Sequence, residues 1–223
     1  MSAGEDPLSS QRLAAMRQAY RREGIDPGGL AGNWPDQLRA WLADAERGGI
    51  IEPNAMVLST VDAAGAPSSR TVLLKGIEDD GLVFFTNYTS RKGRQLEHDP
   101  RAAVVFPWYD VHRQVHAEGA VEKLPAADSD AYWASRPRGS QLGALASPQS
   151  AVIASRDVLE QAVTELAARY PDDEPIPRPE HWGGYRLVPH AVEFWQGRAD
   201  RLHDRLRFHR AGDGTWTCER LAP

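Results

Sequence analysis

The chain of 223 residues contains only one cysteine, Cys218. A disulfide framework within the chain and a cysteine-based zinc site each need at least two cysteines, so the sequence excludes both. It has no run of 18 apolar residues, and its first ten residues, MSAGEDPLSS, lack the basic-then-apolar order of a secretion signal. The sequence therefore predicts a protein of a reducing compartment, the cytoplasm, without a membrane segment.

Several common functional motifs are also missing. The sequence has no G-x-x-x-x-G-K-[ST] loop, no G-x-G-x-x-G and no G-x-S-x-G, which removes the usual signals of nucleotide-binding folds and serine hydrolases. Its seven histidines lack metal-ligand spacing, so no metal site is predicted. A net charge of -5 argues against general nucleic-acid binding. An organic cofactor is the more economical source of chemistry.

Local basic clusters stand out against this acidic background, above all in residues 193–208, EFWQGRADRLHDRLRF. In an extended conformation, a period of two places cationic side chains on one face and mainly apolar ones on the other. The cationic face would hold Arg201, His203, Arg205 and Arg207, and the apolar face Leu202, Leu206 and Phe208. Because guanidinium groups pair with phosphate and stack on rings, this face indicates a surface for a flat anionic ligand; a solvated strand face is the alternative.

The order of the remaining elements predicts an α+β fold that is mainly antiparallel. Residues 1–8 are predicted to be a flexible leader and residues 9–223 a single domain. Helices are expected at 9–22, 35–47, 126–135, 139–146 and 155–170, the last with Val158, Leu159, Val163 and Leu166 facing inward. Strands are expected at 55–62, 68–77, 82–87, 101–109, 113–124, 184–196, 202–210 and 215–220. The first three would form a meander, and the first five favour a small barrel that closes its own edges.

A second basic cluster, residues 89–100, predicts a phosphate site. Thr89 or Ser90 can cap a helix whose first turn carries Arg91 and Lys92. Cations in a first turn oppose the helix dipole unless an anion binds there, where backbone N–H groups point outward. A merely exposed helix start is the alternative.

A third group of polar residues predicts a second phosphate cradle. Tyr132 and Arg136 lie four residues apart on one helix face, and Ser140 follows in a proline-broken stretch. Arg70 and Lys75 point to opposite faces of a regular strand, so both reach one ligand only if the strand bends.

Taken together, these runs resemble the pyridoxine/pyridoxamine 5'-phosphate oxidase family of FMN enzymes. The resemblance covers roughly residues 9–223 and rests on PNAMVLSTVD, SRTVLLK, FFTNYTSRKGRQLEHDPRAAVVFPW, RQVHAEG, YWASRPRGSQLGALASPQS, WGGYRL, VEFWQGRADRLHDRL and ERLAP. It implies a split β-barrel of about six to eight strands with flanking helices, and a homodimer with two FMN sites at the subunit interface. Phe85, where many relatives carry tyrosine, and Pro148 are small departures.

The resemblance also implies a role for individual residues. FMN would be held by Arg70, Thr71, Val72, Leu73, Leu74, Lys75, Phe85, Thr86, Arg91, Lys92, Gln114, Gln149, Ser150, Trp195 and Arg205. The substrate would contact Lys75, Tyr132, Arg136, Ser140, Arg201, Leu202 and His203, with Arg17 and Tyr20 in a segment that closes over it. Arg201 and His203 would be the catalytic residues.

The activity implied is oxidation of pyridoxine and pyridoxamine 5'-phosphates to pyridoxal 5'-phosphate. Hydride would pass from the substrate C4' carbon to flavin N5, and oxygen would take up the electrons as hydrogen peroxide, with ammonia released from the amine. A non-catalytic flavin or pyridoxal phosphate binding protein and a deazaflavin-dependent reductase are the alternatives. Neither would require Tyr132, Arg136, Ser140, Arg201 and His203 together.

Overall fold

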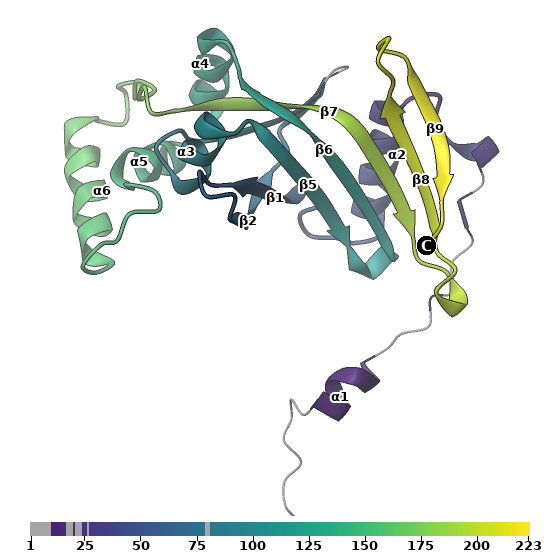
Figure 1. Cartoon of the computed structure of the whole chain (residues 1–223). Helices are drawn as coiled ribbons and strands as arrows, with labels where there is room; N and C mark the ends of the chain where they lie inside the picture. The colour runs from purple at the N-terminus through teal and green to yellow at the C-terminus, as the bar shows by residue number, and fades with distance from the viewer. Residues whose placement is uncertain (1–9, 17–19, 21–23, 26, 79–80) are drawn as a thin grey trace, which may run out of the picture.

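The computed structural model describes residues 10–16, 20, 24–25, 27–78 and 81–223. Within these residues, nine strands form one antiparallel sheet, with six α-helices and three short 3-10 helices around it (Figure 1). None of these helices is long and apolar enough to cross a membrane. The predicted leader, residues 1–8, lies outside the described residues.

The bounds of the elements match most of the sequence predictions to within a few residues. The strands are β1 (Ala55–Val61), β2 (Pro67–Leu73), β3 (Gly76–Glu78), β4 (Gly81–Asn87), β5 (Arg101–Trp108), β6 (Arg113–Lys123), β7 (Trp182–Gln196), β8 (Asp204–Arg210) and β9 (Trp216–Leu221). The helices are α1 (Ser10–Ala15), α2 (Trp34–Arg47), α3 (Arg91–His98), α4 (Ala126–Ser135), α5 (Arg138–Ala146) and α6 (Asp157–Arg169). The 3-10 helices are η1 (Pro27–Gly29), η2 (Tyr109–Val111) and η3 (Ala199–Arg201).

The strand order shows that the sheet curls into an open barrel. Its order is β2-β1-β5-β6-β7-β4-β3, with β8 and β9 continuing from β7. β2 and β3 lie at opposite ends of this path, yet only Leu74 and Lys75 separate them in sequence. The Leu74 N–H donates to Asn54 O and the Lys75 N–H to Val83 O, both over 2.8 Å. Two consecutive residues therefore join the two edges, and the sheet must fold back on itself.

Helix α2 covers one part of the barrel for reasons that its sequence makes clear. The Asn33 side chain accepts a hydrogen bond from the Asp36 N–H, and Pro35 occupies the first turn, where its missing N–H costs nothing. Leu38 and Trp41 are buried, and the Trp41 ring meets Phe194 of β7 edge-on at 5.2 Å. The helix seals the core that the barrel strands enclose.

A second, smaller core lies under α4, α5 and α6. It consists of Trp133, Leu142, Ile176 and Trp182. The Trp133 indole donates to Ile176 O over 2.7 Å, which ties α4 to the segment between α6 and β7. This core fixes the polar faces of α4 and α5 relative to the start of β7 (Figure 1).

Two helix predictions are wrong in detail. The first helix ends at Ala15, and Met16 and Tyr20 are not helical. Leu13 and Met16 are largely exposed, so this short helix lacks the packing that would extend it. In α6, Val163 and Leu166 pack against the smaller core, but Val158 is 44% exposed.

Two strand predictions are also wrong. The expected meander of the first three strands does not form, because β2 pairs only with β1 while β4 pairs with β3 and β7. The expected strand at 68–77 is two strands, β2 and β3. Within the described residues, the main path of the sheet still has seven strands, in agreement with the predicted split barrel of about six to eight. The chain leaves the sheet at Leu74–Lys75 in order to cross from one edge to the other.

Candidate functional site

A polar cavity of about 650 Å³ lies between the barrel and the helices α4 and α5. Several predicted site residues from distant segments line it. They are Leu73, Lys75, Phe85, Thr86, Tyr132, Arg136, Ser140 and Gln149. Aromatic rings form one wall, since the Phe85 ring stacks on Tyr132 at 3.9 Å and on Trp182 at 5.6 Å.

Arg136 is the main positive group of the α4–α5 side of this cavity. Its guanidinium lies over the Trp182 ring at 4.5 Å, and Nη2 donates to the Ser140 carbonyl over 3.0 Å. Nη1 is buried and has no hydrogen-bond partner among the described residues. Burial lowers the pKa of Arg136, although its interaction with Tyr132 raises it. A guanidinium group at the wall of a polar cavity, with no ion pair to a carboxylate among the described residues, is suited to an anion such as phosphate.

The N-terminal end of α3 lies next to this cavity, because Lys92 binds Thr86 and Gln149, which line it. Ser90 caps the helix by accepting from the Gly93 N–H over 3.2 Å. The Arg91 N–H donates to Ser150 Oγ over 3.1 Å, so the 147–150 turn lies against this helix end. Ser150 has a φ of 75°, in the left-handed region that residues other than glycine rarely adopt.

Lys92 is buried, only 8% exposed, and its ammonium group reaches into the same region. Nζ donates to Gln149 Oε1 over 2.7 Å and to Thr86 Oγ1 over 3.1 Å. Burial, and then the charge of Arg70, lower the pKa of Lys92 from 10.5 to about 8.

Arg70 completes this positive cluster. Its guanidinium binds Thr60 Oγ1, Ser68 Oγ and the Leu58 carbonyl, and burial and the charge of Arg91 lower its pKa. None of the carboxylates in the described part of the chain forms an ion pair with Arg70, Arg91 or Lys92. Three cations that share only neutral partners fit a phosphate-bearing cofactor such as FMN, whose phosphate would supply the missing negative charge.

The segment from Arg70 to Lys75 bends. A bend is the condition that the sequence analysis set for both side chains to reach one ligand. Leu73 and Lys75 line the cavity, whereas Leu74 is buried and Val72 packs against the core. Thr71 is exposed. For this reason, Val72 and Leu74 can meet a cofactor only through their backbone groups.

A second cavity, of about 620 Å³, lies at the far end of β6 and β7. Its walls include Tyr20, His112, Gln114 and Trp195. The Tyr20 ring meets His112 at 4.6 Å and His203 at 5.6 Å, and the His203 ring meets Trp195 at 4.7 Å. Arg17 lies outside the described residues.

The predicted cationic face exists only in part. β8 begins at Asp204, so Arg201 and Leu202 belong to the turn before it, and Leu202 is 70% exposed instead of facing the core. The two arginines that do lie in β8 are not free to bind an anion. Arg205 makes a two-pronged ion pair with Glu193, and Arg207 pairs with Glu219. The role of Arg205 at the cofactor stays a prediction.

The two cavities lie too far apart to share one ligand within one chain. Trp182 at the start of β7 lines the first, and Trp195 near its end lines the second. Thirteen residues of extended chain separate them, which corresponds to about 40 Å. Figure 1 shows the same separation, with α4 and α5 at one end of β7 and the β7–β8 turn at the other. Arg201 and His203 therefore do not join Lys92 and Arg136 within one chain.

Two residues that line these cavities, and one buried residue near them, were not predicted from the sequence. Trp182 forms an aromatic wall of the first cavity, and His112 lines the second. Asp204 is a buried carboxylate beside the predicted catalytic turn. The sequence offered one signal, the acidic residue directly after His203 in RLHDR.

Comparison with known families matches almost the whole described chain. Residues 36–170 match the family described as "Pyridoxamine 5'-phosphate oxidase". Residues 182–223 match the "Pyridoxine 5'-phosphate oxidase C-terminal dimerisation region".

Individual relatives agree with these family matches. The chain is 54% identical to a pyridoxine/pyridoxamine 5'-phosphate oxidase of Saccharopolyspora erythraea over 95% of each chain. It is 53% identical to the protein of the same name from Salinispora arenicola, over 94% of this chain and 96% of that one.

Two solved structures share the fold. One is PhzG from Burkholderia lata in complex with tetrahydrophenazine-1-carboxylic acid, at 34% identity and a TM-score of 0.83 over 89% of this chain and 98% of that one. The other is a pyridoxamine 5'-phosphate oxidase-related, FMN-binding protein from Nostoc punctiforme, with a TM-score of 0.67 over 87% of this chain and 99% of that one. At 20% identity, this second likeness concerns the fold alone. The neighbours agree with the predicted split barrel.

Proposed function

The chain belongs to the pyridoxamine 5'-phosphate oxidase family, and from this premise we propose that it oxidises pyridoxine and pyridoxamine 5'-phosphates to pyridoxal 5'-phosphate. Oxygen is the final electron acceptor and becomes hydrogen peroxide. The alcohol substrate yields the aldehyde directly, and the amine yields it with uptake of water and release of ammonia.

One observation carries this proposal, namely the cradle around Arg136. A phosphate there would meet the side chains of Arg136, Lys75, Tyr132 and Ser140, which line the same cavity. An oxidase acting on a ligand without phosphate would gain nothing from burying an unpaired guanidinium nitrogen. The cradle thus supports a phosphorylated ligand over the deazaflavin alternative, and the presence of Arg201 and His203 in the same chain favours an enzyme over a non-catalytic binding protein.

The positive cluster at α3 is the proposed FMN phosphate site. Lys92, Arg91 and Arg70 would bind the phosphate, and Thr86, Gln149 and Ser150 would hold neighbouring polar atoms. FMN, when bound, supplies a two-electron acceptor that oxygen can reoxidise. The chain itself contributes binding and orientation, since two rings held in fixed geometry react far faster than two that meet by diffusion.

A second copy of the chain completes the site. Because the cavity with Arg136 and the residues Arg201 and His203 lie at opposite ends of β7, we infer that the partner in a homodimer provides Arg201 and His203. The match to a dimerisation region at residues 182–223 supports this arrangement. There, His203 and Arg201 would orient the reacting end of the substrate and could take up its proton.

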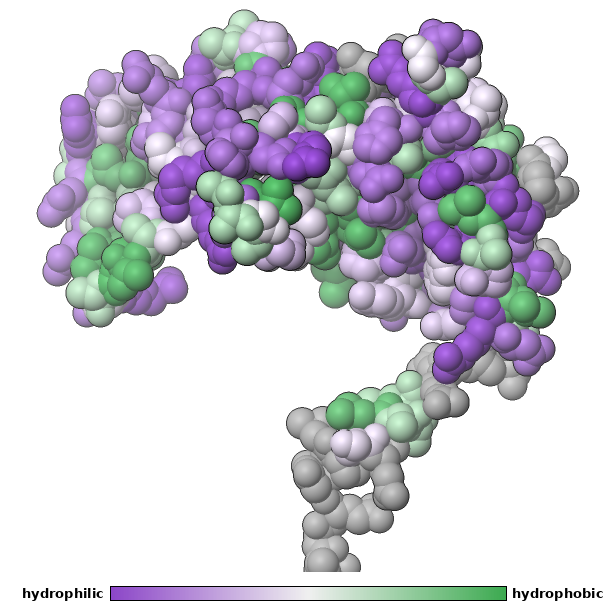
Figure 2. All heavy atoms as spheres, in the orientation of Figure 1, coloured by the Kyte–Doolittle hydropathy of each residue, from purple (hydrophilic) through white to green (hydrophobic). Residues whose placement is uncertain are grey.

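Exposed apolar side chains support burial by a partner. Val152, which is fully exposed, lies in the loop before α6, and Val158, which is 44% exposed, lies in the first turn of this helix. On the face in Figure 2, hydrophilic residues predominate and the hydrophobic ones gather in limited areas. Exposed hydrophobic areas of this kind often mark interaction surfaces. The cytoplasmic location and the single domain at 9–223 remain part of the proposal.

The decisive experiment measures hydrogen peroxide from the purified, FMN-loaded chain on addition of four vitamers. These are pyridoxine and pyridoxamine, each with and without the 5'-phosphate. We expect peroxide and pyridoxal 5'-phosphate only from the two phosphorylated vitamers. Arg39→Gln, an exposed ion-pair variant on α2, is the matched control for Arg136→Gln and should keep full activity. A flavin-loaded protein that is inert toward all four vitamers would refute the proposal.

A further inference from the structure

The turn that connects β7 and β8 has a strained backbone. Asp200 and Arg201 both have positive φ angles, of 55° and 62°. Residues other than glycine adopt this left-handed region at a cost, so the conformation persists only where other contacts hold it. Because the same turn carries His203, the contacts that hold it also decide where the imidazole lies.

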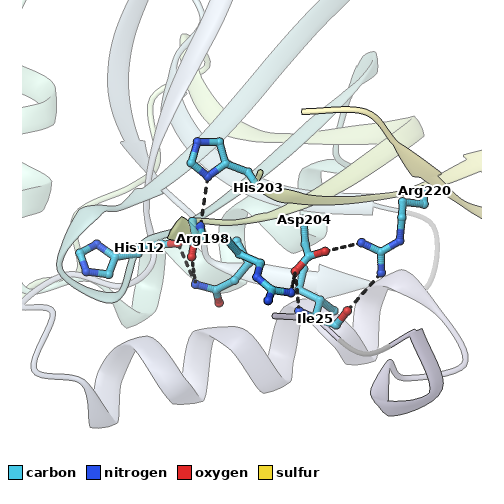
Figure 3. Close-up of polar contacts among 8 residues, drawn as sticks. Ile25, His112, Arg198, His203, Asp204 and Arg220 are labelled. Carbon is cyan, nitrogen blue, oxygen red and sulfur yellow. Dashed lines mark hydrogen bonds and ion pairs between the residues drawn. The ribbon is translucent and has the colours of Figure 1, made fainter. Parts of the chain in front are cut away.

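Asp204, the first residue of β8, supplies these contacts. Its side chain is buried and binds groups from three separate segments (Figure 3). Oδ2 accepts hydrogen bonds from the Ile25 N–H over 3.0 Å and from Arg198 Nη1 over 3.3 Å. Oδ1 pairs with Arg220 of β9, whose Nη2 also donates to the Ile25 carbonyl over 3.2 Å. One carboxylate therefore joins the segment at 24–25, the turn and the last strand.

The carboxylate is charged at neutral pH. Burial alone would raise the pKa of Asp204, but hydrogen bonds from Arg220, the Ile25 N–H and Arg198 lower it below its ordinary value. The segment at 24–25 lies directly against these groups, since a Cβ on Gly24 would stand 2.1 Å from Arg198 Nη1 and 2.4 Å from Asp204 Oδ2. Only glycine allows this approach.

This turn also fixes the imidazole ring of His203. The Arg198 N–H donates to His203 Nδ1 over 3.1 Å. A nitrogen that accepts a hydrogen bond carries no proton, so the neutral ring carries its proton on Nε2. In Figure 3 the second ring nitrogen faces away from the network around Asp204. It has no hydrogen-bond partner among the described residues, and the ring packs beside Tyr20 and Trp195.

We propose that Asp204 is a positioning residue for the oxidation. By holding the Arg198 guanidinium and the Ile25 backbone together, it keeps the strained turn closed, so that the Arg198 N–H sets the tautomer of His203 and Nε2 faces the substrate. The proposal rests on the proposed function, but its structural half does not depend on activity. It also explains why a charged group lies buried next to the predicted catalytic histidine.

The test uses Asp204→Asn in the full, FMN-loaded dimer and reads two quantities. The first is the tautomer of His203, from the ¹⁵N chemical shifts of its ring nitrogens. We expect an Nε2–H form in the unaltered chain and a mixture of both tautomers in the variant. The second is turnover, for which we expect kcat to fall by about 10- to 100-fold with KM unchanged, the size of effect that a misplacement of about 1 Å produces.

Glu219→Gln is the matched control, because it also converts a carboxylate paired with an arginine into an amide but does not touch the turn. Arg198→Gln, whose side chain is 46% exposed, leaves Asp204 paired with Arg220 and covers the case in which Asp204→Asn does not fold. It should shift the tautomer in the same way. Asp204→Asn and Arg198→Gln variants that keep the Nε2–H form and the full kcat would overturn the proposal, as would equal losses in Glu219→Gln. An inactive unaltered chain would count against the proposed function, while the tautomer would still decide this inference.

Discussion

Replacing Lys92 with methionine should stabilise the flavin-free protein at neutral pH, although it removes a residue of the cofactor site. Burial and Arg70 lower the pKa of Lys92 from 10.5 to about 8. At about 1.4 kcal/mol for each pH unit, a buried ammonium group with this pKa destabilises the fold at pH 7 by about 3 kcal/mol. Methionine has a similar length and no charge, so it avoids this penalty.

The penalty is offset in part by hydrogen bonds that methionine cannot make. Lys92 donates to Gln149 and Thr86, and each bond contributes about 1 kcal/mol. The expected net gain in the free energy of unfolding is therefore about 1 kcal/mol at pH 7. Because the folded pKa lies below the unfolded one, the unfolded chain binds the extra proton between pH 8 and 10.5, and the penalty fades as pH rises through this range. At pH 10 it falls below about 1 kcal/mol, so the variant should then be less stable than the unaltered chain.

The assay is urea unfolding of flavin-free protein at pH 7 and pH 10, with FMN titration at pH 7. FMN should bind about 10- to 100-fold more weakly to Lys92→Met, because a hydrogen bond to a charged group is lost. Lys123→Met, which removes a half-exposed lysine paired with Glu97, is the control and should change stability little at either pH. A stability difference for Lys92→Met that has the same sign at both pH values would refute the reasoning, as would unchanged FMN affinity.

Three further predictions follow from single contacts. Arg136→Gln should raise KM for the phosphorylated vitamers about 10- to 100-fold in steady-state assays and leave FMN affinity unchanged, since it loses a charge-assisted phosphate contact; a proportional loss of FMN would contradict this. Co-expression of Arg136→Gln with Arg201→Met, assayed at a substrate concentration well below the raised KM so that each variant alone is nearly inactive, should restore about a quarter of the unaltered rate, because half of the dimers then contain one intact site; no recovery would place both residues in one chain's site. Gly93→Ala should destabilise the protein by about 1–3 kcal/mol in urea unfolding, since its Cβ would stand 2.0 Å from Tyr88 O, whereas Gly139→Ala meets nothing within 4 Å and should not.

Local signals such as helix caps predicted the helices whose ends are set by residues close in sequence. The helix after Ser90 begins at the predicted cap, and α2 begins within one residue of its predicted start at 35. Such signals act within a few residues, so a single sequence reveals them. The first helix failed the same reasoning because its expected apolar stripe found no surface to pack against.

The periodicity of the sequence could not predict which distant segments contact one another. The run at 70–75 reads as one continuous strand, and only the sheet order shows that it must cross between two edges at Leu74–Lys75. The cationic face at 201–207 likewise depends on what lies across the sheet. Register places Glu193 opposite Arg207 and Glu219 beside it, and these carboxylates neutralise charges that the sequence alone presents as free.

The distribution of paired and unpaired charges then separates the two kinds of arginine in this chain. Arg205 and Arg207 in β8 meet carboxylates from neighbouring strands, so they stabilise the sheet whether or not a ligand is bound. Arg136 and Lys92 meet only neutral groups and bear lowered pKa values, so the fold carries a cost there until an anion arrives. A site that is costly when empty binds its ligand more tightly for the same contacts, because the ligand also relieves the cost. This coupling ties the stability of the α3 and α4–α5 regions to the phosphates that they are proposed to bind.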